Sequence, residues 1–122
     1  MTLGSRLIAL THVPKGGQVG YGGTWVAPEA MTVGIVGAGY GDGYPQSAQN
    51  GTPVLVGDVI CPLVGRVSMD MLAVDLRPHP GSLIGDPVIL WGEGLPVEHV
   101  ARMSHTSPYE ILTRMTPRPK RL

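Results

Sequence analysis

Three of the four tyrosines in this chain lie in glycine-rich segments that could bring a phenol close to a bound molecule. Tyr21 lies within Val-Gly-Tyr-Gly-Gly-Thr-Trp (19–25), and Tyr40 and Tyr44 lie within Gly-Tyr-Gly-Asp-Gly-Tyr-Pro (39–45). Flanking glycines let the backbone approach a partner closely, and the phenol can then form a hydrogen bond or move a proton. A tyrosine packed over a turn, with its hydroxyl bonded to protein, is the commoner alternative for any one of them.

Two aspartates lie in comparable turns. Asp42 follows Tyr40 by two residues, and Asp70 lies between two methionines. Either could serve as an acid–base group, although a carboxylate in such a turn more often accepts hydrogen bonds from backbone amides. The histidines lie in separate segments without the spacing of metal ligands, so we predict no metal site; they are His12, His79, His99 and His105.

Lysine and cysteine are scarce. Lys15 lies in a glycine turn and Lys120 in the basic tail, so we do not expect a buried lysine that forms a Schiff base in this chain. The single cysteine, Cys61, excludes an internal disulfide and is compatible with a reducing cytoplasm. The glycines at every second position of 37–43 fit neither the dinucleotide fingerprint nor the P-loop.

Short strands must position these residues, because 18 glycines and 12 prolines make up about a quarter of the 122 residues and leave little room for long helices. Apolar runs predict a first hairpin over 7–25 and strands over 31–38, 54–56, 59–61, 63–69, 71–76 and 86–91. Helical spacing follows Pro96, and Ser107-Pro108-Tyr109-Glu110 has the pattern of a capped helix start. The expected fold is mainly β: an antiparallel, barrel-like domain with two short C-terminal helices.

Length and charge exclude several function classes. A chain of 122 residues is long enough for one domain with one core. Nine Lys and Arg residues balance nine Asp and Glu residues, so the excess positive charge of a nucleic-acid-binding protein is missing. The first residues lack the pattern of a signal peptide, and no apolar run is long enough to cross a bilayer. We therefore expect neither a nucleic-acid partner nor a membrane partner.

Four motifs follow one another along the chain. Two are the tyrosine motifs at 19–25 and 39–45, and the others are Val-Gly-Arg-Val-Ser-Met-Asp-Met (64–71) and Gly-Asp-Pro-Val-Ile-Leu-Trp-Gly (85–92). Together with the opening Met-Thr-Leu and the segment Ser-Pro-Tyr-Glu-Ile-Leu-Thr-Arg (107–114), they resemble the C-terminal domain of bacterial alanine racemase. The resemblance therefore covers nearly the whole chain.

This resemblance implies that residues 1–122 are the C-terminal β domain of an isomerase that interconverts L-alanine and D-alanine, the latter being used for peptidoglycan. In that family an N-terminal (β/α)8 barrel, which we expect to be absent from this chain, holds pyridoxal 5′-phosphate covalently on a lysine. The β domain closes the active site of the other subunit of a homodimer. We therefore expect a cytoplasmic bacterial enzyme with a small amino-acid substrate, whose isolated C-terminal domain is inactive.

The resemblance also implies roles for individual residues. Tyr21 would be the catalytic base on one face of the substrate, and the backbone amide of Met69 would meet the substrate carboxylate. The remaining assignments are Tyr40 and Arg66 at the substrate entrance, Tyr109 at the cofactor phosphate, and Asp42 and Asp70 as structural residues near the site. Gln46 departs from the family pattern, which commonly has Arg there, and this leaves the charge of the entrance open.

Two other functions remain open at this point. One is the same domain in an amino-acid racemase of broader specificity, because the entrance and the absent barrel would set substrate breadth. The other is a non-catalytic β-barrel binding module that keeps the shape without the chemistry. An in-frame upstream barrel with a cofactor-binding lysine would favour the enzyme over the module.

Overall fold

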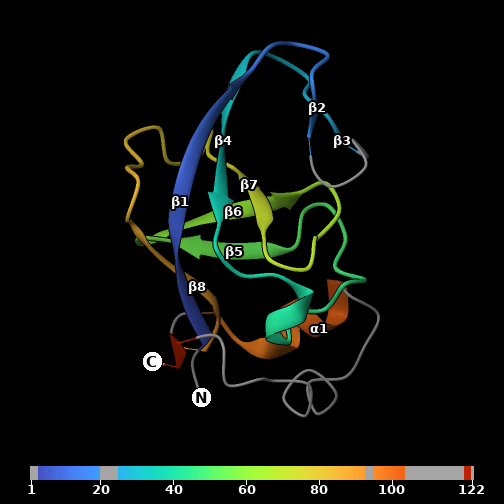
Figure 1. Cartoon of the computed structure of the whole chain (residues 1–122), viewed down its shortest axis with the longest axis vertical. Coiled ribbons are helices and arrows are strands. Elements are labelled where there is room, and N and C mark those ends of the chain that lie inside the picture. The colour runs from blue at the N-terminus through green and yellow to red at the C-terminus, as the bar shows by residue number, and fades with distance from the viewer. Residues whose placement is uncertain (1–2, 20–24, 93–94, 104–119, 122) are drawn as a thin grey trace.

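The computed structural model describes residues 3–19, 25–92, 95–103 and 120–121 (Figure 1). Strands dominate the described part of the chain, with one short α-helix near its end. In chain order the elements are β1 (Leu3–Val13), β2 (Gln18–Val19), β3 (Trp25–Val26), β4 (Met31–Val36), a 3₁₀ turn (Tyr40–Asp42), β5 (Pro53–Val56), β6 (Val59–Val64), β7 (Leu72–Asp75), β8 (Pro87–Trp91), α1 (Val97–Met103) and β9 (Lys120–Arg121).

Six strands close into an antiparallel barrel in the order β1–β4–β7–β6–β5–β8. The barrel closes through β1, whose first residues pair with β8 and whose later residues pair with β4 (Figure 1). The register of β1 against β4 shifts between Leu7 and Ala9. Because such an irregularity bends a strand and increases its twist, one long strand can serve both halves of the barrel.

Buried and less buried side chains alternate along the strands, because successive side chains of a strand point to opposite faces. In β5, Val54 and Val56 are fully buried, whereas Leu55 between them is half-buried. Both faces of β7 are covered: Leu72 and Val74 belong to the main core, and Ala73 belongs to a second apolar cluster. That second cluster includes Val19 of β2, so part of the outer surface of the barrel is also packed.

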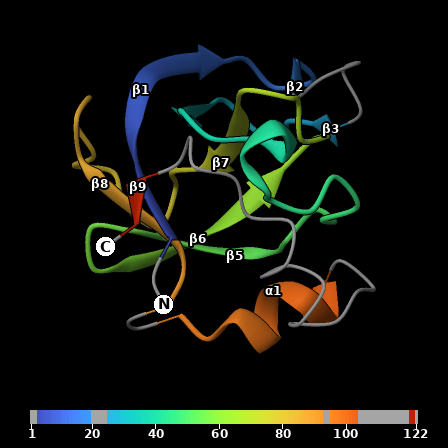
Figure 2. The same cartoon turned by 60° about the horizontal axis from the view of Figure 1, so that its bottom comes forward.

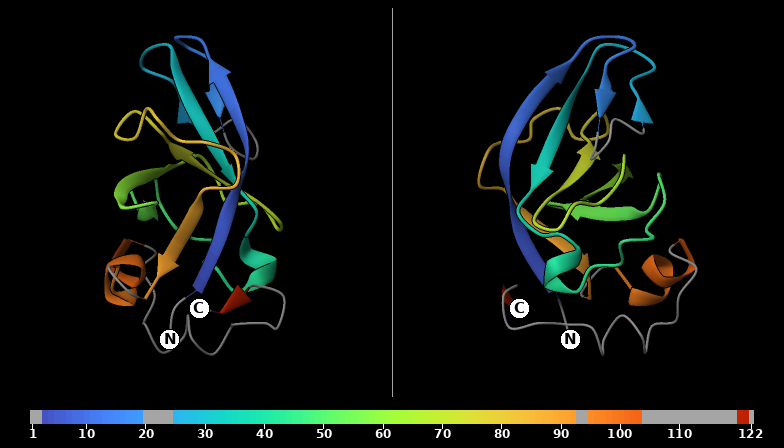
Figure 3. Two further views of the ribbon diagram at one scale, coloured as in Figure 1. Left: turned by 90° about the vertical axis from the view of Figure 1, so that its left-hand side faces the viewer. Right: turned by 45° about the vertical axis from the view of Figure 1, so that its right-hand side comes forward.

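The predicted first hairpin over 7–25 is wrong. The turn at 14–17 does form, with the N–H of Gly17 donating to the carbonyl of Pro14 at 2.8 Å, but the strand before it pairs with β4. β2 instead pairs with β3, where Val19 lies opposite Trp25. The two views of Figure 3 show β2 and β3 near one end of β1, while α1 lies near the opposite end. The six residues of β4 are mostly apolar, so β4 buries more of the apolar surface of β1 than the two-residue strand β2 could.

The predicted strand over 63–69 is also wrong, because β6 ends at Val64. Gly65 follows with a φ of +77°, a left-handed conformation that stops the strand. The other predicted strands are confirmed as β4 to β8 with shifted ends. The β5–β6 hairpin turns at Gly57-Asp58, between the predicted strands over 54–56 and 59–61, with Gly57 at a φ of +58°.

The first predicted C-terminal helix is confirmed as α1, while the second, over 107–116, lies outside the described residues. Figure 2 shows α1 beside the end of the barrel where both chain ends lie. The ends meet because Leu3 of β1 pairs with Arg121 of β9. The mainly β, barrel-like fold class is therefore confirmed.

Candidate functional site

Two of the motifs lie against each other in the structure. The N–H of Tyr40 donates to the carbonyl of Ser68 at 3.0 Å, and the N–H of Gly41 donates to the carbonyl of Met69 at 2.9 Å. We call the 3₁₀ turn with its flanking glycines (residues 39–43) the 39–43 turn, and residues 68–71 the 68–71 segment. Two backbone hydrogen bonds thus join them. Tyr40 and Met69, nearly thirty positions apart in the sequence, become neighbours at this junction.

Gly39 allows the junction by its lack of a side chain. A Cβ at this position would lie 2.7 Å from the carbonyl carbon and oxygen of Met69 and closer still to the carbonyl oxygen of Ser68. Its φ is −151°, which any residue can adopt, so space and not backbone conformation requires glycine here. The close approach of one backbone to another is therefore built into the Gly-Tyr-Gly-Asp-Gly motif.

Asp42 holds the 39–43 turn from within. Its carboxylate is buried, and Oδ2 accepts a hydrogen bond from the N–H of Gly39 at 3.1 Å. The N–H of Asp42 in turn donates to the carbonyl of Gly39 at 3.0 Å. Gly43 then ends the turn with a φ of +100°. This is the amide-bonding geometry that a carboxylate in such a turn commonly has.

The 68–71 segment is itself a closed turn. The hydroxyl of Ser68 donates to the carbonyl of Met71 at 2.9 Å and accepts from the N–H of Met71 at 3.0 Å. The N–H of Ser68 also donates to that carbonyl at 2.9 Å. Asp70 lies at the exposed tip of this turn, so of the two aspartates the structure buries only Asp42.

The junction exposes apolar side chains to solvent. Tyr40 is 39% exposed, and Met69 and Met71 are 51% and 46% exposed. Single exposed apolar side chains are normal on a protein surface, whereas a group of three large ones at one place is unusual. Such a group is typical of a binding surface.

The backbone amide of Met69 is directed away from the 39–43 turn. The described chain has no cis peptide bond, and in a trans peptide the C=O and N–H point in opposite directions. Because the carbonyl of Ser68 points toward the N–H of Tyr40, the N–H of Met69 points the other way. Among the described residues no acceptor is bonded to it. The arrangement leaves a backbone donor available beside an exposed apolar side chain.

Arg66 lies on the loop between β6 and β7, three residues before Met69. It is exposed and borders a cavity of about 410 Å³ with Ala48, Gln49, Asn50 and Gly65. The side-chain Oδ1 of Asn50 accepts a hydrogen bond from the N–H of Gly65 at 2.7 Å, which fixes the start of the loop. Arg66 therefore offers a positive charge to solvent near the junction.

Tyr44 is a core residue, although its glycine-flanked motif made it a chemical candidate. It is 2% exposed and stacks on Trp91 with ring centroids 5.9 Å apart. Burial raises the pKa of the phenol above its usual range, so it stays protonated. Of the three tyrosines in glycine-rich segments, Tyr21 lies outside the described residues, as does Tyr109 of the C-terminal segment, so the structure places only Tyr40 on the surface.

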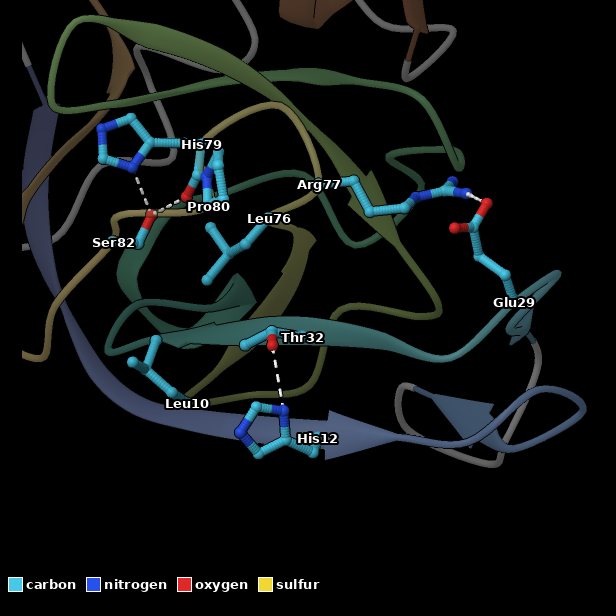
Figure 4. A pocket seen from close by; sticks show the side chains of 9 residues that line it. All are labelled: Leu10, His12, Glu29, Thr32, Leu76, Arg77, His79, Pro80 and Ser82. Carbon is cyan, nitrogen blue, oxygen red and sulfur yellow. Dashed lines mark hydrogen bonds and ion pairs between the residues drawn. The ribbon is translucent and has the colours of Figure 1, made fainter.

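A separate cavity of about 500 Å³ lies between β1, β4 and the loop that follows β7 (Figure 4). It is lined by Leu10, His12, Glu29, Thr32, Leu76, Arg77, His79, Pro80 and Ser82. Its polar groups bond to one another: His12 Nδ1 lies 3.1 Å from the Thr32 hydroxyl, and Arg77 donates to Glu29 at 3.0 Å (Figure 4). The sequence gives no sign of this cavity, because its two histidines are far apart in the chain.

Two further features are absent from the described residues. No three His, Cys, Asp or Glu side chains gather in a way that could hold a metal ion. Within the same residues, no helix has the length and apolar character needed to span a membrane. The junction of the 39–43 turn with the 68–71 segment is the candidate site, because it combines exposed apolar side chains with a backbone donor.

Comparisons with known proteins match nearly the whole chain. The family model described as "Alanine racemase, C-terminal domain" matches residues 1–122. Among curated proteins, the alanine racemase of Nitrosococcus oceani is 60% identical over 118 residues, which are 97% of this chain and 33% of the relative. The biosynthetic alanine racemase of Escherichia coli K12 is 56% identical, with the same coverage of 97% and 33%.

Solved structures give the same result at the level of the fold. The crystal structure of the biosynthetic alanine racemase from Pseudomonas aeruginosa matches with a TM-score of 0.94 and 54% identity, over 97% of this chain and 33% of that one. This chain thus spans about a third of the length of the relatives that it matches. The match of the family model over every residue shows that the chain belongs to the alanine racemase C-terminal domain family.

Proposed function

We propose that this chain is part of an enzyme that interconverts L-alanine and D-alanine. The observation that carries the proposal is the junction that sets Tyr40 beside Met69 on an exposed apolar surface, with a backbone donor next to it. The relatives named alanine racemase support it, and they are about three times as long as this chain. The rest of the active site would therefore lie on parts of the protein outside these residues.

Tyr21 is the proposed acid–base residue of this chain. Racemisation inverts one carbon, so a proton leaves one face of the substrate and another proton arrives on the opposite face. A phenol with an ordinary pKa of about 10 is a poor base at neutral pH unless positive charge or hydrogen bonding favours its ionised form. That support, and the group that works on the opposite face, would come from the part of the protein outside this chain.

The amide of Met69 is the proposed contact for the substrate carboxylate. A backbone N–H that has no acceptor among the described residues can donate a charge-assisted hydrogen bond to a carboxylate oxygen. The side chain of Met69, 51% exposed beside that N–H, would limit the space for substrate side chains and so favour a small amino acid.

The remaining assignments stay proposals. Tyr40 and Arg66 would line the entrance, where the exposed Arg66 would attract an anionic carboxylate. Tyr109 would contact the phosphate of the cofactor. Asp42 and Asp70 would act as structural residues near the site, as the bond from Asp42 to the backbone of Gly39 illustrates.

Lys15 does not fit a covalent site for pyridoxal 5′-phosphate. Such a site needs a lysine in a protected setting, whereas Lys15 is exposed in the turn at 14–17. We therefore propose that an N-terminal barrel of the same protein holds the cofactor. We also propose that the full-length protein is a cytoplasmic homodimer, that its β domain faces the active site of the partner subunit, and that it supplies D-alanine for peptidoglycan.

The test is racemisation by the full-length protein, measured by chiral chromatography from L-alanine and from D-alanine. We expect conversion in both directions, and we expect Tyr21→Phe to lower the rate by about 10² to 10⁴-fold, as for loss of an acid–base group. Tyr44→Phe is the matched control, because it removes a phenol hydroxyl from the core, and it should keep near wild-type activity. Wild-type protein without activity on either enantiomer would refute the proposed function.

A further inference from the structure

We infer that Gly39 and Asp42 are positioning residues for the backbone amide of Met69. This inference rests on the proposed function, because it takes that amide as the contact for the substrate carboxylate. Neither residue needs to touch the substrate. Both act through the 39–43 turn, which is the backbone surface against which the Ser68–Met69 peptide lies.

The first support of the amide is steric. The backbone at Gly39 lies so close to the Ser68 and Met69 carbonyls that a methyl group there would overlap both. The atoms in the way are backbone atoms, which cannot turn aside as the end of a flexible side chain can. Any side chain at position 39 must therefore move the Ser68–Met69 peptide or the 39–43 turn.

The second support is the set of hydrogen bonds that gives the 39–43 turn its shape. Asp42 Oδ2 accepts from the N–H of Gly39, and the N–H of Gly43 donates to the carbonyl of Tyr40 at 3.2 Å. In this shape the successive N–H groups of Tyr40 and Gly41 donate to the successive carbonyls of Ser68 and Met69. Loss of the Asp42 bond would leave a buried N–H without its acceptor and loosen that presentation.

These supports together fix where the Met69 N–H points. The Ser68 carbonyl bonds to Tyr40, and the rigid trans peptide then directs the next N–H to the opposite side. Ser68 is also tied to Met71 through its hydroxyl, so the peptide is held at its other end. A small rotation of the peptide would misdirect the donor without disturbing the barrel.

The experiment compares two glycine variants of the full-length protein. Gly39→Ala places a methyl group against backbone, at 2.7 Å or less. In Gly37→Ala the nearest atom is a side-chain methyl carbon, Cγ2 of the exposed Ile8, 3.1 Å away, so a small shift of that side chain relieves the contact. A donor shared equally by bound substrate and transition state affects KM more than kcat. We therefore expect Gly39→Ala to raise the KM for alanine at least about tenfold, as for one hydrogen bond to a charged group, with a smaller change in kcat. Gly37→Ala should keep the wild-type KM.

A pair of variants at position 42 separates positioning from charge. Asn keeps an oxygen that accepts the Gly39 N–H, whereas Ala has none. We expect Asp42→Ala to raise KM as Gly39→Ala does, and Asp42→Asn to stay within a few-fold of wild type. If Asp42→Asn raises KM as much as Asp42→Ala does, the positioning role is overturned. This pair also decides the question if Gly39→Ala does not fold.

Binding of propionate, which is alanine without its amino group, gives a readout that does not depend on turnover. Calorimetry should show weaker binding to Gly39→Ala and Asp42→Ala than to wild type and Gly37→Ala. Equal KM values and equal propionate affinities in Gly39→Ala and Gly37→Ala would overturn the inference. If wild-type protein does not racemise alanine, the proposed function fails separately, and the propionate comparison still tests how the amide is positioned.

Discussion

Tyr44 stacks on Trp91 in the core of the barrel, with ring centroids 5.9 Å apart and ring planes 16° apart. The two rings fill much of the core, since they are its largest fully buried or nearly buried side chains. Within the described chain, neither the Tyr44 hydroxyl nor the Trp91 Nε1 has a hydrogen-bond partner. A buried polar atom without a partner raises the free energy of the folded state.

Tyr44→Phe removes one of these atoms and keeps the ring. We expect the free energy of unfolding to stay equal or to rise by about 1 kcal/mol, because the hydroxyl loses its hydration on folding and gains no bond in return. The unfolding midpoint of the full-length protein, measured by calorimetry, checks this. Tyr44→Ala, which leaves a cavity, should lower stability by about 3 to 5 kcal/mol. A clear loss of stability in Tyr44→Phe would contradict this prediction, because it would mean that the hydroxyl has a hydrogen-bond partner in the folded protein.

Cys61 predicts a loss of stability at alkaline pH. Burial, with a smaller effect from the negative charge of Asp75, raises the pKa of this thiol from 9.0 to about 11. The folded state therefore holds the proton more tightly than the unfolded state, so this contribution to stability is complete below about pH 9 and is lost as the pH rises toward 11. Unfolding midpoints of wild type and Cys61→Ala, compared from pH 8 to 11, should show the advantage of wild type shrinking. A difference that is independent of pH would contradict the prediction.

Arg77 should matter more for stability than its exposure suggests. Its Nε donates to both carboxylate oxygens of the buried Asp75, at 3.1 and 2.9 Å, and its NH2 group donates at 2.7 Å. Arg77→Met would leave that carboxylate without these donors, so we expect a lower unfolding midpoint. Glu29→Gln removes only the exposed ion pair between Glu29 and Arg77, so it should change the unfolding midpoint little. Equal effects of the two variants would contradict this division.

Much of the barrel could be predicted from local patterns. Apolar runs with turn residues between them located β4 to β8. The errors arose where pairing depends on distant partners. The residues before the turn at 14–17 read equally well as half of a hairpin, and only closure of the barrel gives β4 the place beside β1.

The candidate site could be predicted only in part. The motifs that contain Tyr40 and Met69 are visible in the sequence, but the contact between them is not, because it depends on two backbone bonds between distant segments. Tyr44 had the same glycine-rich context as Tyr40 and yet lies in the core. The 3₁₀ turn directs these two tyrosines to opposite environments, and composition carries no signal of that difference.

We propose that this chain supplies one of two acid–base groups to an active site shared between subunits. The test mixes two inactive full-length variants: Tyr21→Phe, and a variant that lacks the lysine holding the cofactor. After subunit exchange, each heterodimer would contain one site with both groups intact and one site with neither. We expect racemisation of alanine to return as heterodimers form, up to about half the wild-type activity per heterodimer. Confirmed heterodimers that remain inactive would contradict the claim.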